Sequence, residues 1–586
     1  MFPLHEPLTD ALREELAEYD ELTAALLARR GILTGSDAKK FLNPSYDNHL
    51  HDPLLMTDME KAARRLAAAI FSGEKIAVWS DYDCDGIPGA VLMHDFLQKA
   101  GANFENHIPH RHDEGYGVNV DGIERLAMSG VTLMVTIDSG ITDSEPIARA
   151  NELGMDVLIT DHHLPAGVLP SAYAVLNPNA RPDETYPFKG LCGSGVAWKL
   201  VCAVLTIEPA LREKVPLGWE KWLLDMVGLA TIADMVPLIG ENRVLAAYGL
   251  IVLRKSPRLG LEKLCRGMRV DQRAITEDDV GFMIAPRVNA ASRMGDAREA
   301  FCLFTTVDED EADSLAKKLE RANRQRKAEA GAITRSVRSR LRERGEMRTI
   351  IALGDPQWRP ALLGLVAGTI AEEFERPVFL WGREGLPAGR QGTGRLKGSV
   401  RSGGPTHIVE LMNAAGDAFE QFGGHAKAGG FTLRDTEVFF LEDRLVLALR
   451  SLGEGGETQS DTFTMRADAA ITPEEIGESF LRNVERLAPF GMSNQKPVFL
   501  LRDVVVREIS RFGKGEEHLK LKINAHEAND KRGSIDAVTF FVKGAPARIA
   551  STLARGSRIN MLAHIERDTF RRGNPVRLRL IDIRPA

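Results

Sequence analysis

Cysteine is scarce in this chain of 586 residues, which contains five cysteines, none of them in a Cys-x-x-Cys pair. A disulfide framework and a thiolate zinc site are therefore not indicated. Long apolar runs are also missing, since no stretch approaches the roughly 18 apolar residues of a membrane span. The first residues lack the basic and then apolar pattern of a signal peptide. We expect a cytoplasmic protein that does not enter a membrane.

An excess of positive charge is absent as well. The chain has 75 Lys and Arg against 82 Asp and Glu, a formal net charge of -7. A protein that coats polyanions with its whole surface is thereby excluded, so any binding of nucleic acid must depend on local basic surfaces. The contents of 44% hydrophobic and 27% charged residues are those of an ordinary globular protein, and the length suggests about three to five domains.

Three carboxylates alternate in the stretch Asp81-Tyr82-Asp83-Cys84-Asp85-Gly86. The apolar run before it, Lys75 to Ser80, predicts a buried strand, and Ala90 to Met93 after it predicts the start of a helix. Three neighbouring carboxylates cannot all ionise unless a cation balances their charge. A metal site is therefore the first hypothesis. The negative field of the two flanking Asp should raise the pKa of the Cys84 thiol and keep it unreactive.

Two alternatives stand beside the metal site. An EF-hand calcium loop also opens with Asp-x-Asp-x-Asp-Gly, but it requires a preceding helix and Glu at its twelfth position. Here the preceding segment is strand-like and the twelfth residue is Leu92. A solvated acidic turn is the second alternative, because Asp and Gly are common turn residues.

Polar residues follow two further apolar runs at the point where each run ends. Val131 to Ile137 leads into Asp138, and Val157 to Thr160 leads into Asp161-His162-His163. The alternation of strands and helices in this region predicts a parallel α/β sheet, and in such sheets ligands bind beyond the carboxyl ends of the strands. Three strands deliver carboxylates and imidazoles to one edge, which favours metal ligation over separate turns.

One more carboxylate, Asp234, follows the apolar helix predicted from Trp222 to Ile232. It could cap the next turn. Alternatively, it could be the remaining carboxylate of a two-metal site, because two ions about 3.5 to 4 Å apart need a bridging carboxylate and several terminal ligands. The residues themselves leave both interpretations open.

Taken together and in this order, Asp-x-Asp-x-Asp-Gly, Thr-Ile-Asp-Ser-Gly, Asp-His-His and the Asp234 segment resemble the DHH phosphoesterase superfamily. Within it, the chain is similar to the 5′ to 3′ exonucleases specific for single-stranded DNA, from about residue 50 to the end. The resemblance implies an α/β fold in which a parallel-sheet DHH domain and a smaller α/β DHHA1 domain are joined by a long helix and followed by a C-terminal β-barrel of the OB type. The implied domains are a helical lead-in at 1–50, the DHH catalytic domain at 51–305, a basic linker helix at 306–347, the DHHA1 substrate-binding domain at 348–455 and the OB-fold at 456–586.

The resemblance also implies two divalent metal ions, Mn²⁺ or Mg²⁺, and mixed carboxylate and imidazole ligands favour Mn²⁺. Asp138 would bridge the ions. The first ion would be held by Asp81, Asp83 and Asp138, and the second by Asp85, Asp138, His162 and Asp234. His163 would contact the phosphate or order the ligands. The implied catalytic residues are Asp83, Asp85, Asp138, His162, His163 and Asp234.

Several other segments resemble substrate-binding motifs of the superfamily. Arg111 and Tyr116 would receive the 5′ end of the strand, while Arg287 and Asn289 would lie near the scissile phosphate. In the second module, the Gly-Ser-x-Arg-Ser and Gly-Gly-His motifs place Ser399, Arg401, Gly424 and His425 at the substrate. Relatives have His where this chain has Arg359, in Trp358-Arg359-Pro360-Ala361. We interpret 382–394, rich in Gly, as a surface insertion.

Two regions suit a nucleic-acid backbone. Lys317 to Arg348 carries twelve Lys or Arg and four Glu, which favours a DNA channel over a solvated linker helix. After about residue 456, five alternating strands predict the barrel. Basic and aromatic residues there suit single-strand binding, namely Arg511, Phe512, Lys514, Lys520, Lys522, Phe570, Arg571 and Arg572.

The function implied is metal-dependent hydrolysis of single-stranded DNA from its 5′ end, in recombination and repair. The expected partner is single-stranded DNA, with a single-strand-binding protein and a helicase as further candidates, and we expect a monomer. One alternative is a phosphodiesterase of the same superfamily that acts on short oligonucleotides or cyclic dinucleotides, and the barrel and the basic helix argue against it. The other alternative is a non-catalytic strand-binding subunit, which the full set of expected ligands disfavours.

Overall fold

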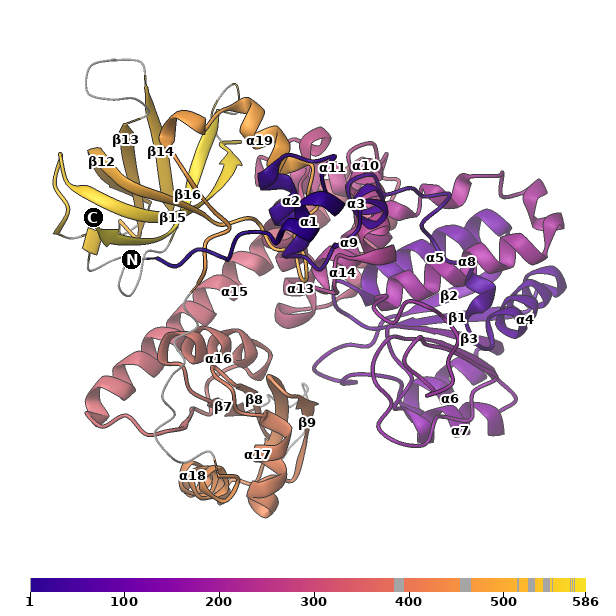
Figure 1. Ribbon diagram of the computed structural model, residues 1–586. Helices are drawn as coiled ribbons and strands as arrows, with labels where there is room; N and C mark the ends of the chain where they lie inside the picture. Colours follow the sequence, from indigo (N-terminus) through magenta and orange to yellow (C-terminus); the bar gives the residue numbers. More distant parts are fainter. Residues whose placement is uncertain are drawn as a thin grey trace. The chain divides into compact units, whose positions relative to one another are not determined.

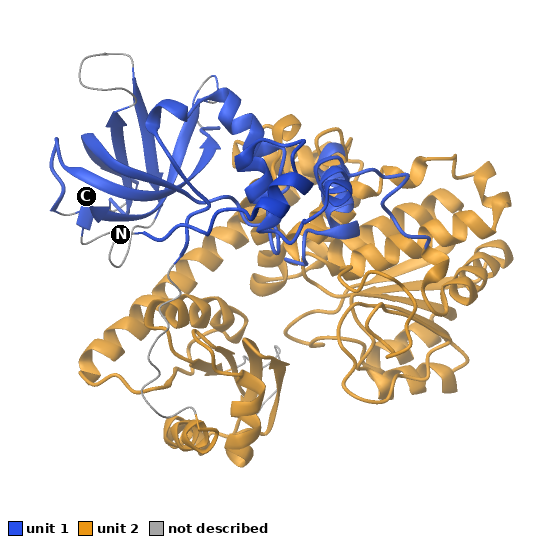
Figure 2. Ribbon diagram, in the orientation of Figure 1, with its two compact units in different colours: residues 1–52, 235–251, 461–586 blue, residues 53–234, 252–460 orange. Residues whose placement is uncertain are grey.

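A computed structural model describes residues 2–383, 395–453, 465–513, 516–524, 533–540, 549–550, 552–569, 571, 573 and 575–586. Most of the expected insertion at 382–394 lies outside these residues, as do Lys514, Phe570 and Arg572. The chain forms two compact units (Figure 2). Unit 1 contains 1–52, 235–251 and 461–586, and unit 2 contains 53–234 and 252–460. Among the described residues, no helix is both long and apolar enough to cross a membrane.

The first sheet of unit 2 is parallel throughout, with the order β2-β1-β3-β4-β5. Helices α6 and α7 cover one face and α5 and α8 the other (Figure 1). Strands β1, β3, β4 and β5 are almost fully buried because they are apolar on both faces, whereas the edge strand β2 is more polar and partly exposed. The strands are β1 (Lys75–Ser80), β2 (Asn103–His107), β3 (Val131–Ile137), β4 (Asp156–Thr160) and β5 (Ala174–Leu176). The helices are α4 (Met59–Ser72), α5 (Gly86–Ala100), α6 (Val120–Met128), α7 (Ser144–Glu152), α8 (Gly193–Ile207) and α9 (Leu224–Ala233).

A helical region and a second sheet complete unit 2. The helices are α11 (Leu259–Met268), α12 (Glu277–Asp279), the π-helix η5 (Val280–Ile284), α13 (Ala285–Met294), α14 (Arg298–Thr305) and α15 (Glu309–Arg344). The 36-residue α15 begins after Asp308, whose side chain accepts from the Glu311 N–H, and ends at Gly345, where φ is 72°. It leads into the second sheet, as expected for a joining helix.

The second sheet has the order β6-β7-β8-β10-β9, with β6 and β7 parallel and the other pairs antiparallel. Its strands are β6 (Ile351–Gly354), β7 (Val378–Arg383), β8 (Leu396–Arg401), β9 (Gln421–His425) and β10 (Ala428–Leu433). The helices α16 (Pro360–Phe374), α17 (Ile408–Ala415) and α18 (Leu441–Ser451) supply apolar faces to two cores around this sheet.

Unit 1 is built around a β-barrel. Its sheet has the order β11-β12-β13-β14-β16-β15, and an additional pairing of β12 with β15 closes it. The strands are β11 (Ala469–Ile471), β12 (Phe499–Phe512), β13 (His518–Asn524), β14 (Ser534–Thr539), β15 (Arg558–Arg567) and β16 (Val576–Pro585). The other elements are α1 (Asp10–Glu15), α2 (Glu21–Ala28), α3 (Gly35–Leu42), α10 (Gly240–Leu253) and α19 (Glu478–Glu485).

The N-terminal helices belong to the barrel unit rather than to the parallel-sheet domain that follows them in sequence. Leu16, Leu26 and Leu27 are fully buried in the same apolar core as residues of the barrel strands. The prediction of a lead-in at 1–50 rests on helix-like Leu spacing, which reports a helix and not the surface against which it packs. The predicted domain boundaries remain predictions.

Short 3₁₀ segments connect these elements: η1 (Pro53–Leu55), η2 (Pro209–Glu213), η3 (Trp219–Lys221), η4 (Gln272–Ala274), η6 (Gly416–Ala418), η7 (Glu437–Phe439) and η8 (Pro473–Glu475). One predicted boundary is wrong. Helix α5 begins at Gly86 and not at Ala90, because the Asp83 side chain accepts hydrogen bonds from the N–H groups of Asp85 and Gly86 and so starts the helix inside the acidic stretch.

Candidate metal centre

Three aspartates follow the ends of three adjacent strands at the same level of the sheet. The N–H of Asp81 donates to Ile137 O on β3, at 3.1 Å, and the N–H of Asp138 donates to Thr160 O on β4, at 2.8 Å. Asp161 continues the series with a 3.0 Å bond to Leu176 O on β5. The ladder thus extends one residue past each strand, which fixes the three Cα positions side by side at the carboxyl edge of the sheet.

The turn after β3 directs Asp138 back over the strand ends. Asp138 has a φ of 59°, in the left-handed region that Asp tolerates better than most residues. It is 2% exposed. Gly193, the first residue of α8, lies against it so closely that an added Cβ would be 2.6 Å from the Asp138 Cβ. Glycine at 193 is therefore required by this approach.

Asp85 is held by the first turn of α8. Its two carboxylate oxygens accept hydrogen bonds from the N–H groups of Gly193, at 2.6 Å, and Ser194, at 2.8 Å. The free N–H groups of a helix N-terminus stabilise a carboxylate in this way. Gly86 permits the tight turn that carries Asp85, since a Cβ there would be 2.3 Å from Asp81 O. The acidic stretch and α8 thereby form one rigid wall of the site.

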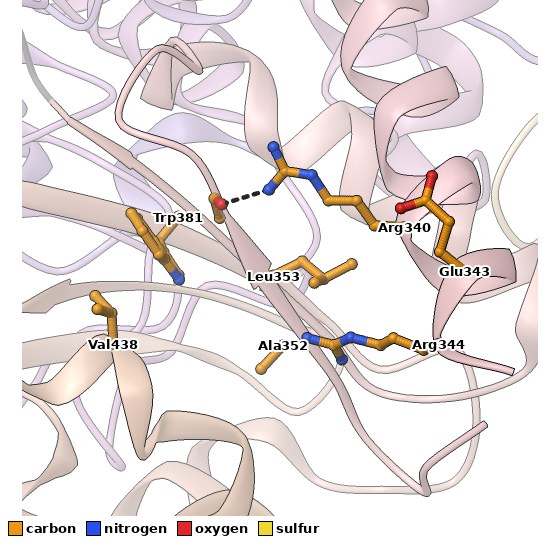
Figure 3. Close-up of a pocket in the computed structure, with 8 residues that line it drawn as sticks. Arg340, Glu343, Arg344, Ala352, Leu353, Trp381 and Val438 are labelled. Carbon is orange, nitrogen blue, oxygen red and sulfur yellow. Dashed lines mark hydrogen bonds between the residues drawn. The ribbon is translucent and has the colours of Figure 1, made fainter. Parts of the chain in front are cut away.

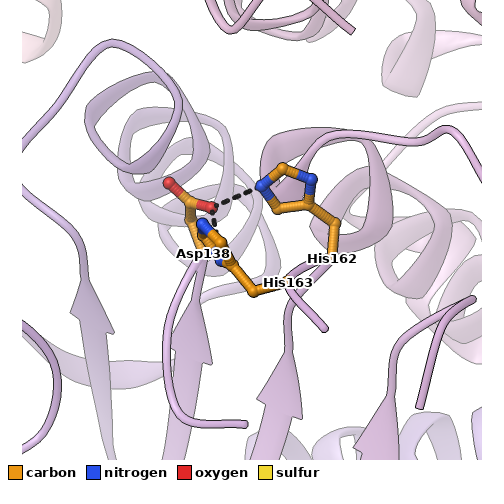
Figure 4. A group of neighbouring side chains, drawn as sticks. All are labelled: Asp138, His162 and His163. Carbon is orange, nitrogen blue, oxygen red and sulfur yellow. Dashed lines mark ion pairs between the residues drawn. The ribbon is translucent and has the colours of Figure 1, made fainter. Parts of the chain in front are cut away.

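The ligand atoms gather into three overlapping groups, within each of which they lie no more than 4.8 Å apart. The groups are Asp81, Asp83 and Asp138; Asp85, His162 and Asp234; and Asp138, His162 and His163. Figure 4 shows both imidazoles directed at the Asp138 carboxylate, with Oδ1 at 3.2 Å from His162 Nε2 and 3.7 Å from His163 Nδ1. His162 Nε2 also lies 3.7 Å from Asp234 Oδ2 and 3.8 Å from Asp85 Oδ2. All the side chains predicted as metal ligands therefore converge.

The electrostatics of this cluster favour a bound cation. Burial, together with the Asp83 charge, raises the pKa of Asp81 well above its usual value, and burial with Asp85 does the same for Asp138. Burial and Asp85 also raise the pKa of Asp234, to about 9. The buried Oδ1 atoms of Asp81 and Asp138 accept no hydrogen bond from the described residues. These oxygens, with a neutral imidazole beside them, fit the donor set of divalent cations.

The two histidines differ in protonation. Burial lowers the pKa of His162, which leaves a neutral ring suited to ligation. For His163, burial also acts to lower the pKa, but the hydrogen bond from Nδ1 to Asp161 Oδ1, at 2.8 Å, and nearby carboxylates raise it to about 9. Asp161 further accepts the N–H groups of His162 and Ile141. Asp161 thus orients His163, and both of its carboxylate oxygens are already occupied by hydrogen bonds.

Both alternatives for the acidic stretch are wrong. An EF-hand needs a helix before its loop, whereas β1 ends at Ser80 and Leu92 is a fully buried residue of α5. A solvated turn would expose its carboxylates, whereas Asp81 is 5% and Asp85 1% exposed. The expected effect on Cys84 is in the right direction, although burial contributes more than Asp83 and Asp85 to the rise in its thiol pKa.

Aromatic side chains line the approach to the cluster. The Arg111 guanidinium lies over the Tyr82 ring, 4.8 Å from its centroid. The Tyr116 ring is 6.4 Å from Tyr82 and 6.3 Å from His163, centroid to centroid, and Tyr116 is 51% exposed. Burial raises the pKa of Tyr82 to about 12. The predicted Arg111 and Tyr116 therefore lie beside the metal centre, with Tyr82 between them as a support that the sequence did not reveal.

The two residues predicted near the scissile phosphate differ in position. Asn289 Oδ1 accepts the N–H of Cys84, at 3.0 Å, so it braces the acidic stretch. Arg287 is 6% exposed and is committed to Glu320 on α15, at 2.7 Å, and to Met283 O. Its partners are thus already supplied by the protein. On the same helix, burial lowers the pKa of Arg293 to about 10, while the charges of Asp83 and Tyr82 act to raise it, so the Arg293 guanidinium is within electrostatic range of the acidic stretch.

The predicted residues of the second module lie on adjacent strands. Register pairs Ala428 with both Arg401 and His425, so these two residues flank the same position of β10. Ser399 and Arg401 lie against α16, where a Cβ on Gly364 would be 2.9 Å from Arg401 Nη2. Gly424 has a φ of 149° and is too close to Ala428 O for a side chain. No hydrogen bond or ion pair within the described part of the chain joins these residues to the carboxylate cluster.

Comparison with known proteins agrees with this arrangement. Sequence models of three families match: the DHH family, N-terminal domain, at 75–231; the DHHA1 domain at 347–450; and the RecJ OB domain at 467–582. The single-stranded-DNA-specific exonuclease RecJ of Escherichia coli is 30% identical over 532 residues, which are 86% of this chain and 87% of that protein. The chain belongs to the RecJ family.

Other RecJ proteins extend this result. The single-stranded-DNA-specific exonuclease RecJ of Bacillus subtilis is 34% identical over 95% of this chain, which spans 66% of that protein's length. The crystal structure of RecJ in complex with Mn²⁺ from Thermus thermophilus matches with a TM-score of 0.77 and 26% identity, over 100% of this chain and 79% of that chain. The predicted family and fold class, with DHH, DHHA1 and OB domains, are confirmed.

Two features of this RecJ-family chain depart from the resemblance. Arg359, where relatives have His, precedes α16 and forms an ion pair with Glu329 on α15, at 3.3 Å. In the barrel, several of the basic residues predicted to bind DNA are paired instead: Lys520 and Arg571 with Asp536, and Lys522 with Glu508. Phe512 is 37% exposed and lies near His518 and Phe540.

A cavity of about 430 Å³ lies in the second module, away from the residues assigned to the metal centre. Figure 3 shows Arg340 and Arg344 on one side and Trp381 and Val438 on the other. Arg340 donates to Gly354 O at 2.8 Å and Arg344 pairs with Glu442 at 3.0 Å. Because its two arginines are already partnered, this cavity offers no free positive charge to a ligand.

Besides Tyr82, sequence reasoning missed three supports of the RecJ-family site. Gly193 and Ser194 hold Asp85, and a signal for them was present in the Gly-Ser-Gly run that opens an apolar helix. The sequence singles out Asp161 as part of a polar run with two His, and not as the residue that orients one of them. Arg293 carried no signal, because helical spacing does not tell which of two arginines faces a site.

Proposed function

We propose that the chain hydrolyses phosphodiester bonds of single-stranded DNA from the 5′ end, with two divalent cations, Mn²⁺ or Mg²⁺, held by the carboxylate and imidazole cluster. The observation that carries the proposal is the convergence on Asp138 of two sets of ligand atoms, Asp81 with Asp83 and Asp85 with His162 and Asp234. When bound, such cations lower the pKa of a water molecule and offset the charge that develops on the attacked phosphate.

Residues of the chain position the metal ligands and the phosphate. Asp138 bridges the two ligand sets, while Gly193 and Ser194 hold Asp85 and leave its oxygens aimed at the centre. His163, kept protonated by Asp161, donates a hydrogen bond to a non-bridging phosphate oxygen. The mixture of imidazole and carboxylate ligands favours Mn²⁺ over Mg²⁺.

The 5′ to 3′ direction of hydrolysis rests on the side chains beside the carboxylate cluster. Arg111 binds the 5′ phosphate and Tyr116, half exposed beside His163, stacks on the terminal base. Ser399, Arg401, Gly424 and His425 bind the same strand from the second module, and the barrel provides a further binding surface for single strands. A single-strand-binding protein and a helicase are the partners we propose, and we place the activity in the cytoplasm.

Neither alternative function is favoured by an observation. The complete ligand set disfavours a non-catalytic strand-binding subunit, and the barrel unit disfavours a phosphodiesterase for short oligonucleotides or cyclic dinucleotides, whose small substrates need no further binding surface. The RecJ proteins of Bacillus subtilis and Escherichia coli are single-stranded-DNA-specific exonucleases, which supports the proposal.

The test uses single-stranded and double-stranded DNA labelled at either end, with Mn²⁺, Mg²⁺ or EDTA. We expect release of labelled nucleotides from the 5′ end of the single strand only, in the presence of either cation. Asp138→Ala should abolish hydrolysis and retain binding of the strand, because it removes the shared ligand and no DNA contact. Equal attack from the 3′ end would refute the polarity, and unchanged hydrolysis by Asp138→Ala would refute the site.

A further inference from the structure

The basic side chains of α15 differ in whether a carboxylate neutralises them. Six form ion pairs with carboxylates of unit 2: Lys317, Lys318, Arg324, Arg338, Arg340 and Arg344. Among the others, Arg326 and Lys327 are adjacent and pair with no carboxylate of the residues that the structure describes. Their positive charge is therefore available to a ligand, whereas the charge of the six paired residues is largely neutralised by carboxylates of the protein.

Arg326 is held in one orientation by a neutral partner. Asn323 is 1% exposed, and its Oδ1 accepts hydrogen bonds from Arg326 Nε, at 3.2 Å, and Nη2, at 2.9 Å. A guanidinium has five N–H donors, so three remain for another molecule. Because Asn323 carries no charge, it fixes the side chain without cancelling the charge. This is the arrangement of a built anion site and not of a solvated surface arginine.

The surroundings of Arg326 are cationic and extend toward the metal centre. Burial and the neighbouring Arg287 lower the pKa of both Arg326 and Lys327. Burial, Arg111 and Arg326 lower the pKa of Arg293 to about 10, against the opposing effect of Asp83. Neighbouring cations that repel one another are stabilised when an anion enters between them. The Arg326 charge thus acts on both Lys327 and Arg293, and the Arg111 charge acts on Arg293.

We propose that Arg326 and Lys327 bind a backbone phosphate of the single strand whose end occupies the metal centre. This inference rests on the proposed function and names the part of α15 that contacts the strand. The free N–H groups of Arg326 match two phosphate oxygens, and Lys327 adds a point charge. The six paired residues of α15 lie outside this contact.

The test compares Arg326→Gln with Arg338→Gln, which removes the same charge from the same helix at a residue paired with Glu373. The probe is a 5′-phosphorylated, fluorescent oligothymidylate of about 20 nucleotides, titrated in EDTA at several KCl concentrations. For Arg326→Gln we expect about ten-fold weaker binding and a salt slope smaller by about 0.7, the value for one phosphate contact with a single strand. Arg338→Gln should keep the wild-type slope.

Further variants separate a binding role from a structural one. Lys327 is exposed, so Lys327→Gln should reduce the slope without any change in melting temperature. Arg326→Lys should restore part of the lost affinity, and Asn323→Asp, which gives Arg326 a carboxylate partner, should weaken binding as Arg326→Gln does. Under Mn²⁺ the KM for the strand should rise while kcat stays near the wild-type value.

Two outcomes are distinguishable. Equal affinities and salt slopes for Arg326→Gln and Arg338→Gln would overturn this inference and leave the nuclease proposal standing. Failure of the wild-type protein to hydrolyse the 5′-labelled strand with Mn²⁺ would refute the proposed function, whatever the salt slopes show.

Discussion

Replacement of Gly193 by Ala should impair the metal centre without unfolding the protein. The new Cβ would be 2.6 Å from the Asp138 Cβ and 2.8 Å from its Cα. Carbon atoms in contact lie about 3.5 to 4.0 Å apart, so Asp138 or the start of α8 must move by about 1 Å. The N–H of residue 193 also donates to Asp85 Oδ2, and the displacement therefore reaches ligands of both proposed ions.

The magnitude follows from this displacement. A misplacement of about 1 Å at a reacting centre can reduce the rate about 100-fold, so we expect kcat to fall by about that factor at saturating Mn²⁺. Binding of single-stranded DNA in EDTA should stay near the wild-type value, because Arg111 and Tyr116 are on another loop. The assay is release of nucleotides from a 5′-labelled single strand over a range of Mn²⁺ concentrations.

Gly195→Ala is the matched control, two residues further along the same helix. A Cβ there would meet its nearest neighbours, Cys192 Sγ and Leu191, at 3.7 Å, an ordinary contact distance. Ala is favoured over Gly in a helix by about 0.8 to 1 kcal/mol, so this variant should be at least as stable as the wild type and fully active. Equal kcat for Gly193→Ala and Gly195→Ala, with similar melting temperatures, would refute the argument that close packing of α8 positions Asp138.

Two further predictions concern protonation. The pKa values of Asp81, Asp138 and Asp234 are raised, the last to about 9. A carboxyl group with a raised folded-state pKa stabilises the fold below its unfolded pKa of 3.8 and loses this contribution as the pH rises through the folded value. In EDTA, the melting temperature of the wild type should therefore fall between about pH 4 and about pH 9, and more steeply than that of Asp234→Asn. Saturating Mn²⁺ should remove this difference. Parallel melting profiles of the two proteins in EDTA would contradict the prediction. Asp161→Asn should lower the pKa of His163 from about 9 and reduce activity about 10- to 100-fold. The alkaline limb of the pH profile of activity should then move to lower pH. An unmoved limb would show that hydrolysis does not use the His163 proton.

The edge of the parallel sheet was predictable from the sequence for a specific reason. Buried parallel strands are continuous apolar runs, so the first polar residue after each run marks the strand end. Asp81, Asp138 and Asp161 each follow such a run. Adjacent pairing of β1, β3 and β4 then places them together. Local pattern and topology agree here, which is why the carboxylate cluster could be predicted before any contact was known.

Contacts between distant segments were not predictable in this way. Gly193 and Asp85 are separated by 108 positions in the sequence, and nothing local to either predicts the other. The same limit explains Arg287, whose partner Glu320 lies on a different helix. The helices of 1–50 were predicted, but their packing on the barrel core depends on residues beyond 470. Periodicity identifies a buried face and leaves its partner undetermined.

Asp138 shows why one residue type satisfies two separate demands. Its φ of 59° costs most side chains about 1 to 2 kcal/mol, and Asp and Asn tolerate it best. Its shared position between the two ligand sets requires a negative charge. Asn would meet the first demand and fail the second, whereas Ala would fail both. Asp138→Asn should therefore lack hydrolysis and, in EDTA, melt no lower than the wild type, while Asp138→Ala should lack hydrolysis and melt at a lower temperature than Asp138→Asn. If both variants melted alike, the backbone of this turn would not be what selects the residue, and the charge alone would account for an aspartate at this position.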